Sequence, residues 1–204
     1  MSEYDATGFN RRHLLRNAPI ALGALSLAVA GQLRAATTPG DKRLVADNTA
    51  GRISTERVLQ INVKLGPEED MGKGADGHRI NYPIVGGHFA GQGLSGTVIP
   101  GGADMSVERD DGVTLIEALY RLKTDDGHVL IIHNPGIWRP NEAGKAKLAK
   151  GQTPAAEDYY CRTTPSFKTP PGRYAWLSDF VFVGTIDDVA DDEVLIGCYR
   201  VEGV

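Results

Sequence analysis

This chain of 204 residues has few cysteines, no hydrophobic run long enough to span a bilayer and no excess of positive charge. It has two cysteines, and it contains no Cys-x-x-Cys or His-x-x-x-His pattern, so we expect no metal site. Lys and Arg number 22 against 26 for Asp and Glu, which gives a formal net charge of −4. Because phosphate contacts need clustered positive charge, nucleic acid is not an expected partner.

Strong catalytic motifs are missing as well. The sequence has no Gly-x-Ser-x-Gly nucleophile elbow, no phosphate-binding loop and no dinucleotide fingerprint. Its short Gly-x-Gly pairs, at Gly72 and Gly91, lack the strand-to-helix setting that a nucleotide site needs. We therefore expect no cofactor, and any chemistry would have to come from the side chains themselves.

The N-terminus carries the clearest signal that is present. Arg11 and Arg12 precede the apolar run 18–30, which ends in the small-residue site Ala28-Val29-Ala30, and residues 33–36 are a second candidate cleavage site. This order of paired arginines, apolar run and cleavage site is typical of a twin-arginine export signal. The run is shorter than the roughly 20 residues that span a bilayer, so we expect no stable membrane insertion.

These features predict three regions. Residues 1–30 are expected to be a signal peptide, residues 31–55 a flexible arm, and residues 56–204 one folded domain. The predicted location is the periplasm or the outside of the cell.

Short alternating runs separated by turn residues fill the rest of the chain. Asp-Gly follows such runs twice, at Asp111-Gly112 and at Asp126-Gly127, and this dipeptide is a strong hairpin signal. The segment 141–152 has no apolar face and is expected to be a surface loop or short helix. We expect strands at 58–65, 79–85, 96–99, 105–109, 114–124, 128–133, 158–163, 174–177, 180–185 and 194–201.

Many short antiparallel strands joined by Gly-rich turns predict an all-β fold, either a sandwich or a barrel. Closure into a barrel is favoured because it removes the exposed strand edges that promote aggregation. In the run 114–124, alternate residues from Ile116 through Tyr120 to Thr124 share the drier face. Tyr120 should therefore point inward, where its hydroxyl would need a partner.

Candidate acid–base groups are few. His88 lies in the Gly-rich segment 86–96, whose glycines could form tight barrel corners or approach a ligand. Asp104 could be a pocket carboxylate or a turn cap. Tyr160 and Arg162 share one face of a strand, where they could bind an anionic or enolate oxygen, unless that face is the outer one.

The two cysteines, Cys161 and Cys198, leave two alternatives. They could form a disulfide in an oxidising compartment, or they could be two buried thiols that pack as small apolar residues.

Several segments together resemble a family of bacterial and fungal proteins, domain-of-unknown-function family 3237, also called uncharacterised protein family 0311. The matching run covers about residues 58–201. Its motifs are Gly86-Gly87-x-Phe89-x-Gly91, Gly96-x-Val98-x-Pro100-Gly101-Gly102-Ala103-Asp104, Tyr120-x-Leu122-x-Thr124-Asp125-Asp126-Gly127, Tyr160-x-Arg162-x-x-Pro165-x-Phe167, Tyr174-x-Trp176-Leu177 and Tyr199-Arg200-Val201.

The resemblance implies a lipocalin-like, calycin-type antiparallel β-barrel with an internal cavity, and it implies no particular activity. Two functions then stand side by side. One is binding of a small organic molecule in the barrel, and the other is a cofactor-independent acid–base enzyme, such as an isomerase, lyase or lactone hydrolase. Assembly into a homo-oligomer stays open. The residues expected to act are His88, Asp104, Tyr160 and Arg162 as catalytic groups, and Phe89, Tyr120, Phe167 and Trp176 as the ligand-binding lining.

Overall fold

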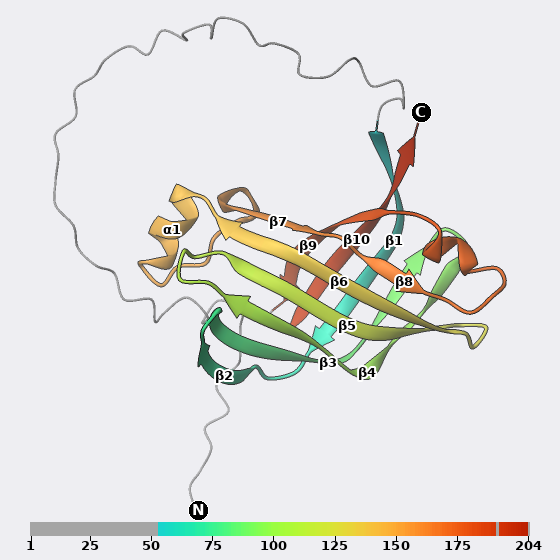
Figure 1. The fold of residues 1–204 in the computed structure, drawn as a ribbon, viewed down its shortest axis with the longest axis horizontal. Helices are drawn as coiled ribbons and strands as arrows, with labels where there is room; N and C mark the ends of the chain where they lie inside the picture. Colours follow the sequence, from blue (N-terminus) through green and yellow to red (C-terminus); the bar gives the residue numbers. More distant parts are fainter. Residues whose placement is uncertain (1–52, 191, 204) are drawn as a thin grey trace, which may run out of the picture.

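The computed structural model describes residues 53–190 and 192–203, and they form a closed antiparallel β-barrel (Figure 1). The expected export signal and most of the expected arm lie outside these residues. In the described part, no helix is long and apolar enough to cross a membrane. The strands are β1 (Ile53–Leu65), β2 (Glu69–Gly74), β3 (Gly77–Gly91), β4 (Leu94–Glu108), β5 (Thr114–Thr124), β6 (Val129–Pro140), β7 (Tyr159–Thr163), β8 (Ser166–Lys168), β9 (Phe182–Ala190) and β10 (Glu193–Gly203).

The wall follows the chain in an up-and-down order. Around the barrel the strands run β1, β3, β4, β5, β6, β7, β9 and β10, and β10 pairs with β1 again. The short strand β2 extends β3 outside this ring, and β8 pairs with β6 beside β7. The pairing of β1 with both β10 and β3 closes the sheet, so the ring has no free edge.

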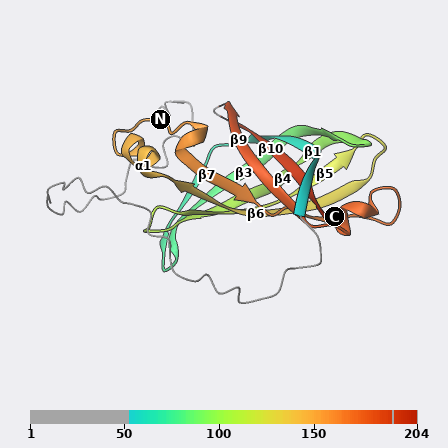
Figure 2. The ribbon, with the colours of Figure 1, turned by 90° about the horizontal axis from the view of Figure 1, so that it is seen from above.

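Within the described residues, three short helical segments sit at the ends of the barrel. The helix α1 (Glu142–Leu148) and the 3-10 turn η2 (Ala156–Asp158) lie at one end, and the 3-10 turn η3 (Ala175–Ser178) lies at the other (Figures 1 and 2). Asn141 caps α1 by accepting a hydrogen bond from the Gly144 backbone N–H at 2.9 Å. The short helix expected within residues 141–152 is confirmed, whereas the strand expected at 174–177 is wrong because that segment coils into η3.

Every strand of the wall contributes buried side chains to the core. On β5 the residues Ile116, Ala118, Tyr120, Leu122 and Thr124 are all buried, so the predicted inward face is confirmed. The two expected Asp-Gly turns are also confirmed, since Gly112 and Gly127 adopt φ values of 81° and 92° between paired strands, and a third, Asp76-Gly77, joins β2 to β3. The alternation of apolar and polar residues therefore predicts correctly which face of β5 is buried.

The glycines of the segment 86–96 allow neighbouring strands to approach closely. A Cβ on Gly87 would lie 2.0 Å from the Asn62 carbonyl oxygen, and one on Gly96 would lie 2.0 Å from the Lys123 carbonyl oxygen. Both glycines also have φ between 130° and 160°, which other residues rarely adopt. Of the two alternatives for this segment, the structure supports tight packing of the wall.

The two cysteines are free and buried, so the disulfide alternative is wrong. Cys198 on β10 pairs with Gly184 on β9, and Gly184 in turn pairs with Thr163 on β7. The strand that carries Cys161 is thus separated from β10 by a whole strand, about 10 Å across, whereas a disulfide needs Cα atoms within about 7 Å. Burial raises the pKa of the Cys198 thiol to about 12, so this thiol stays protonated.

Candidate functional site

Polar side chains interrupt the apolar interior on the inward face of β4. Asp104 and Ser106 are each only 3% exposed. The Asp104 Oδ1 atom accepts a hydrogen bond from the Ser106 hydroxyl at 3.1 Å and another from the Glu117 backbone N–H at 2.9 Å. A carboxylate deep in an apolar barrel is costly unless such donors satisfy it. These contacts therefore fix Asp104 in one orientation inside the wall.

The strand register extends this polar character across the barrel. Asp104 lies directly opposite Tyr82 on β3 and Ala118 on β5, and Ala118 lies opposite Asn134 on β6. Side chains in directly opposite positions share one face, with Cβ atoms about 5 Å apart. The carboxylate of Asp104 and the amide of Asn134 thus face the same interior, separated only by the small side chain of Ala118.

Asn134 is the most unusual residue of the interior. It is 0% exposed, and neither its Nδ2 nor its Oδ1 atom has a hydrogen-bond partner among the described residues. An unsatisfied buried polar group costs about 1–3 kcal/mol, so natural proteins rarely keep one without a use. The amide is thus a complete and unused hydrogen-bonding edge inside the barrel.

Two further hydroxyl groups share this property and lie next to Asn134. The Tyr120 and Thr163 hydroxyls have no hydrogen-bond partner in the part of the chain that is described, and each residue is 2% exposed. Tyr120 pairs with Ile132 and Thr163 with Gly136, the two positions that flank Asn134 on the same face of β6. Both side chains are therefore diagonal neighbours of the amide, within reach across the ladder. We call Asp104, Tyr120, Asn134 and Thr163 the interior polar set.

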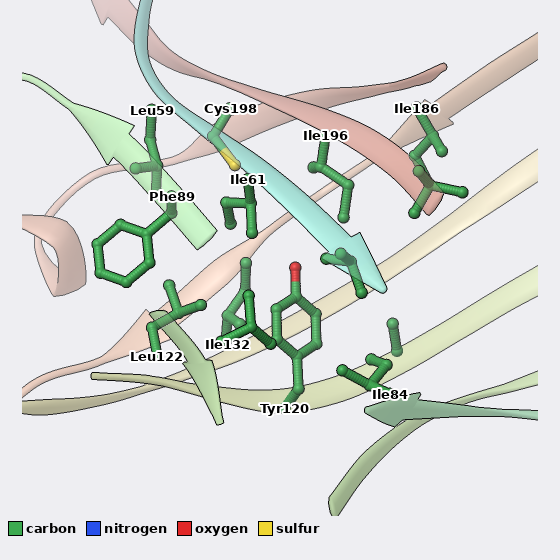
Figure 3. Close-up of a cluster of buried hydrophobic side chains, with 14 of the residues drawn as sticks. Leu59, Ile61, Ile84, Phe89, Tyr120, Leu122, Ile132, Ile186, Ile196 and Cys198 are labelled. Atoms are coloured by element: carbon green, nitrogen blue, oxygen red, sulfur yellow. The ribbon is translucent and has the colours of Figure 1, made fainter. Parts of the chain in front are cut away.

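Figure 3 shows how Tyr120 stands in the core. Its ring rises from β5, and its hydroxyl points across the barrel toward β1 and β10, which carry Ile61 and Ile196. Burial, and after it electrostatic interaction with Cys198 and Asp104, raises the pKa of Tyr120 well above its usual value of 10. The hydroxyl therefore stays protonated and can donate a hydrogen bond at any physiological pH.

Glycines make room for this set in the wall. A Cβ on Gly102 would lie 2.4 Å from the Cβ of Tyr120. On either side of Thr163, a Cβ on Gly136 would lie 2.5 Å from its Cγ2 atom, and one on Gly184 would lie 2.1 Å from its Oγ1 atom. Any side chain at these three positions would collide with Tyr120 or Thr163. Glycine therefore lets the neighbouring backbone pack directly against both side chains, which holds them in place.

Of the four aromatic residues expected to line a ligand site, Tyr120 belongs to the interior polar set, and Phe167 lies opposite Ile132 on β6. Phe89 and Phe167 are buried, and Phe167 packs edge-to-face on Phe182 with ring centroids 5.2 Å apart. Trp176 is only partly buried against the core, and the Arg200 guanidinium lies 5.7 Å from its ring centroid. The structure thus brings Phe89, Tyr120 and Phe167 into the barrel and leaves Trp176 at its margin.

Three of the four expected catalytic residues lie outside the barrel. His88 is exposed on β3, Tyr160 is 50% exposed on β7, and Arg162 is exposed beside it. The Arg162 guanidinium stacks 5.6 Å from the Tyr160 ring centroid and donates a hydrogen bond to the Cys161 carbonyl. The expectation that these side chains project into a cavity is therefore wrong, because Cys161 and Thr163 occupy the inward face of β7. Only Asp104 faces the interior as expected.

A second acidic residue, Glu108, lies on the same face as Asp104 and Ser106, at the C-terminal end of β4. Glu108 is half-buried, opposite His78 on β3, and burial raises the pKa of its carboxyl to about 7. The charges of Glu68 and Asp70 act in the same direction, while His78 opposes them. Burial likewise raises the pKa of Glu68. The His78 ring also hydrogen-bonds Asp70 at 2.7 Å. Glu108 can therefore exchange a proton near neutral pH.

Within the described residues, no group of three or more His, Cys, Asp or Glu side chains is arranged to hold a metal ion. The interior polar set offers one carboxylate, one amide and two hydroxyls, which can form hydrogen bonds and transfer protons.

Known proteins share this barrel. The sequence model of DUF3237, a family described as protein of unknown function, matches residues 53–201. A UPF0311 protein of Rhodopseudomonas palustris is 36% identical over 144 residues, which span 70% of this chain and 94% of that protein. This chain belongs to the DUF3237 family.

Solved structures of similar proteins agree with the DUF3237 barrel. A conserved protein of unknown function from Rhodopseudomonas palustris superposes with a TM-score of 0.67 at 34% identity, over 74% of this chain and 99% of the other. A β-barrel-like protein from Acinetobacter baumannii gives a TM-score of 0.66 at 29% identity, over 74% and 97%. The resemblance inferred from the motifs is therefore confirmed.

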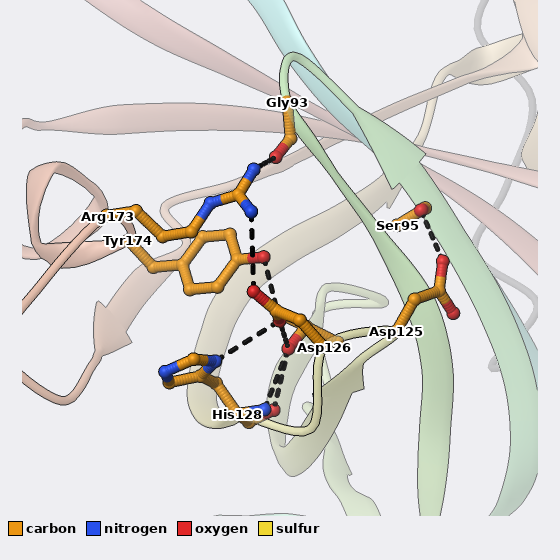
Figure 4. A network of polar contacts seen from close by, with 8 residues as sticks. Gly93, Ser95, Asp125, Asp126, His128, Arg173 and Tyr174 are labelled. Atoms are coloured by element: carbon orange, nitrogen blue, oxygen red, sulfur yellow. Dashed lines mark hydrogen bonds and ion pairs between the residues drawn. The ribbon is translucent and has the colours of Figure 1, made fainter.

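One motif of this DUF3237 chain closes the η3 end of the barrel (Figure 4). The Asp126 carboxylate accepts hydrogen bonds from the Thr124 hydroxyl at 2.5 Å and from the Tyr174 hydroxyl at 3.0 Å. Arg173 adds an ion pair to Asp126 at 3.4 Å and donates to the Gly93 carbonyl at 2.9 Å. Chiefly because of the Thr124 hydrogen bond, the pKa of Asp126 is lowered far below its usual value. This network ties the β5–β6 turn to the η3 segment, which is a structural role.

Asn134, Thr163 and Glu108 are the candidates that the sequence analysis missed in this DUF3237 chain. A signal for Asn134 was present, since it continues the alternation of Leu130 and Ile132 on the buried face of β6. An asparagine at the third position of an apolar face is a buried polar residue that needs an explanation. The other two could not be found in this way, because their faces contain few apolar residues.

Proposed function

We propose that this protein binds a small organic molecule inside the barrel, with the interior polar set as the anchor. The observation that carries the proposal is Asn134, whose fully buried amide has no partner among the described residues. Binding sites for small molecules are mostly apolar, with a few polar groups that fix the orientation of the ligand. Phe89, Leu122 and Ile132 supply apolar surface, and Tyr120 and Asn134 supply polar groups.

The energetics support a ligand role over a purely structural one. An amide that satisfied its own hydrogen bonds would stabilise the fold, whereas this amide lowers stability by the cost of its desolvation. A ligand that completes those hydrogen bonds recovers that cost on binding. Unsatisfied polar groups that persist in a core therefore support a binding role, as strain does at other functional sites.

Thermal denaturation of the full chain with a panel of metabolites tests this proposal. A ligand that binds only the folded state, at 100 times its Kd, stabilises it by about 2.7 kcal/mol. The same hits should give no stabilisation of Asn134→Leu. Asn62→Leu is the matched control, because Asn62 lies on the outer face of β1 and donates to Glu193. If every hit stabilises Asn134→Leu as much as the wild type, the proposal is wrong.

A second function, acid–base catalysis without a cofactor, is favoured by Asp104. Its carboxylate is fixed by two donors and lies close enough to Tyr120 to raise the pKa of that hydroxyl. In such an enzyme Asp104 would accept a proton from the substrate, and the Tyr120 and Asn134 donors would stabilise the developing oxygen anion. Isomerisation, elimination or lactone opening would fit. Asp104→Asn should then keep binding and lose turnover, and full turnover in this variant would exclude the role.

We further propose that the barrel is of the lipocalin-like type and that the protein is exported. The up-and-down strand order supports the first point, and the sequence of residues 1–30 supports the second. Replacing Arg11 and Arg12 by lysine should retain the protein in the cytoplasm, because the twin-arginine route requires both arginines. Cell fractionation measures the location of the protein, and unchanged export of the variant would contradict this assignment.

A further inference from the structure

The charge of the interior restricts what it can bind, and the argument rests on the proposed binding function. Among the described residues, the buried polar and charged side chains are Asp104, Ser106, Thr124, Asn134, Asp158 and Thr163. None of them is a Lys, Arg or His. An anionic ligand would therefore lose its hydration without gaining a cation, and it would add to the negative charge of Asp104.

The shape of the free hydrogen-bonding edge restricts the ligand further. A carboxamide side chain presents an acceptor and a donor side by side, and at Asn134 both are free. The group that completes such an edge presents a donor beside an acceptor, as a primary carboxamide or the cis-amide of a lactam does. Two parallel hydrogen bonds then form, whichever way the Asn134 amide is turned. A carboxylate or an ester offers acceptors only and leaves the Oδ1 atom unsatisfied.

The neighbours of Asn134 agree with this complement. Tyr120 and Thr163 lie diagonally on either side of it. The Tyr120 hydroxyl has no partner among the described residues and can donate a hydrogen bond to an oxygen of the same ligand. Thr163 turns its methyl group toward Gly136 on the strand of Asn134 and its hydroxyl toward Gly184 on β9, so it adds apolar surface on this side. Beyond them the faces of Ile132 and Ile84 are apolar and buried, which suits the flat surface of a ring.

We propose that the barrel selects a neutral, planar ring compound that carries a carboxamide or lactam edge, which pairs with Asn134 and excludes the corresponding carboxylate. Asn134 favours ligands that carry an amide edge, and Asp104 disfavours ligands that carry a negative charge.

Isothermal titration of the full chain with matched probes tests this assignment. Benzamide and 2-pyridone carry the edge, benzoate is the anionic isostere of benzamide, and toluene has the ring alone. We expect benzamide or 2-pyridone to bind at least tenfold more tightly than benzoate or toluene. We expect the preference to disappear in Asn134→Leu and to persist in Asn62→Leu.

The outcomes separate this inference from the proposed function. If benzoate, or an anionic hit of the metabolite panel, binds as tightly as the amides and depends on Asn134, the ligand class is wrong while the binding function stands. If hits that depend on Asn134 all lack an amide edge, the ligand class is also wrong. If no compound binds in a manner that depends on Asn134, the binding function itself fails. Hits that carry the edge and are lost in Asn134→Leu support both.

Discussion

Replacing Asn134 by leucine should make this protein more stable and at the same time abolish ligand binding. Leucine keeps the branch at Cγ and exchanges the two polar atoms for methyl groups, in a side chain that is fully buried. A substitution that removes a buried hydrogen-bonding group normally destabilises a protein. Here the sign should be reversed, because the lost atoms have no partner among the described residues.

The magnitude follows from the two terms involved. Removing an unsatisfied buried amide recovers about 1–3 kcal/mol, and the larger volume of leucine can cost up to about 1 kcal/mol in strain. Ala118 and Gly136, the residues beside this position, are small and limit that strain. We therefore expect a net gain of about 1–2 kcal/mol in the free energy of unfolding. For a domain of this size this corresponds to about 2–8 °C in Tm.

Urea denaturation followed by far-ultraviolet circular dichroism measures this gain. The midpoint should rise at an unchanged slope, because the surface exposed on unfolding stays the same. Asn134→Ala removes the same atoms without added volume, so it separates overpacking from the loss of hydrogen bonds, and it should be close to neutral. A loss of about 2 kcal/mol or more in both variants would refute the reasoning, since it would show that the amide is satisfied within the folded chain.

Three further predictions concern the rest of the barrel. Glu108→Gln should be more stable than the wild type by about 1–2 kcal/mol near pH 8, and the difference should close near pH 5. The reason is the raised pKa of about 7, because between pH 4.5 and pH 7 the folded state binds more protons than the unfolded state. The wild type therefore loses stability as the pH rises through this range. Denaturation midpoints across this pH range measure it, and a constant difference would contradict the role of burial. Gly87→Ala should cost more than about 2 kcal/mol in the same assay because its Cβ would lie 2.0 Å from a β1 carbonyl, whereas Gly93→Ala, with open space around it, should cost about 1 kcal/mol. Tyr160→Phe and Arg162→Ala should leave the Kd of any interior ligand unchanged within about twofold, and a large loss of affinity would return these residues to the site.

The sequence predicted the fold well because the relevant signals are local. Asp126-Gly127 marks a turn by itself, and the alternation around Tyr120 identifies both the strand and the face that is buried. Local signals also misled at one place. The aromatic segment at Tyr174 has high strand propensity, but its hydrogen bond to Asp126 and the packing of Leu177 favour a 3-10 turn.

The site was predicted less completely because alternation alone does not say which face is inside. Tyr160 and Arg162 do share a face, as the spacing indicates, but the apolar content of β7 is too small to orient it. Its inward face carries Cys161 and Thr163, and Thr163 fits there because Gly136 and Gly184 on the neighbouring strands leave room. The neighbourhood of Asp104 and Asn134 depends on the register of three strands, and an irregularity in β4 shifts that register.

A crystal structure of the full chain with the strongest hit of the metabolite panel tests the central claim most directly. We expect the ligand inside the barrel, with its polar edge within about 3 Å of both amide atoms of Asn134 and its ring against the neighbouring apolar side chains. A ligand bound on the outer wall, for example beside Tyr160, with Asn134 satisfied only by water or by the protein itself, would contradict the claim.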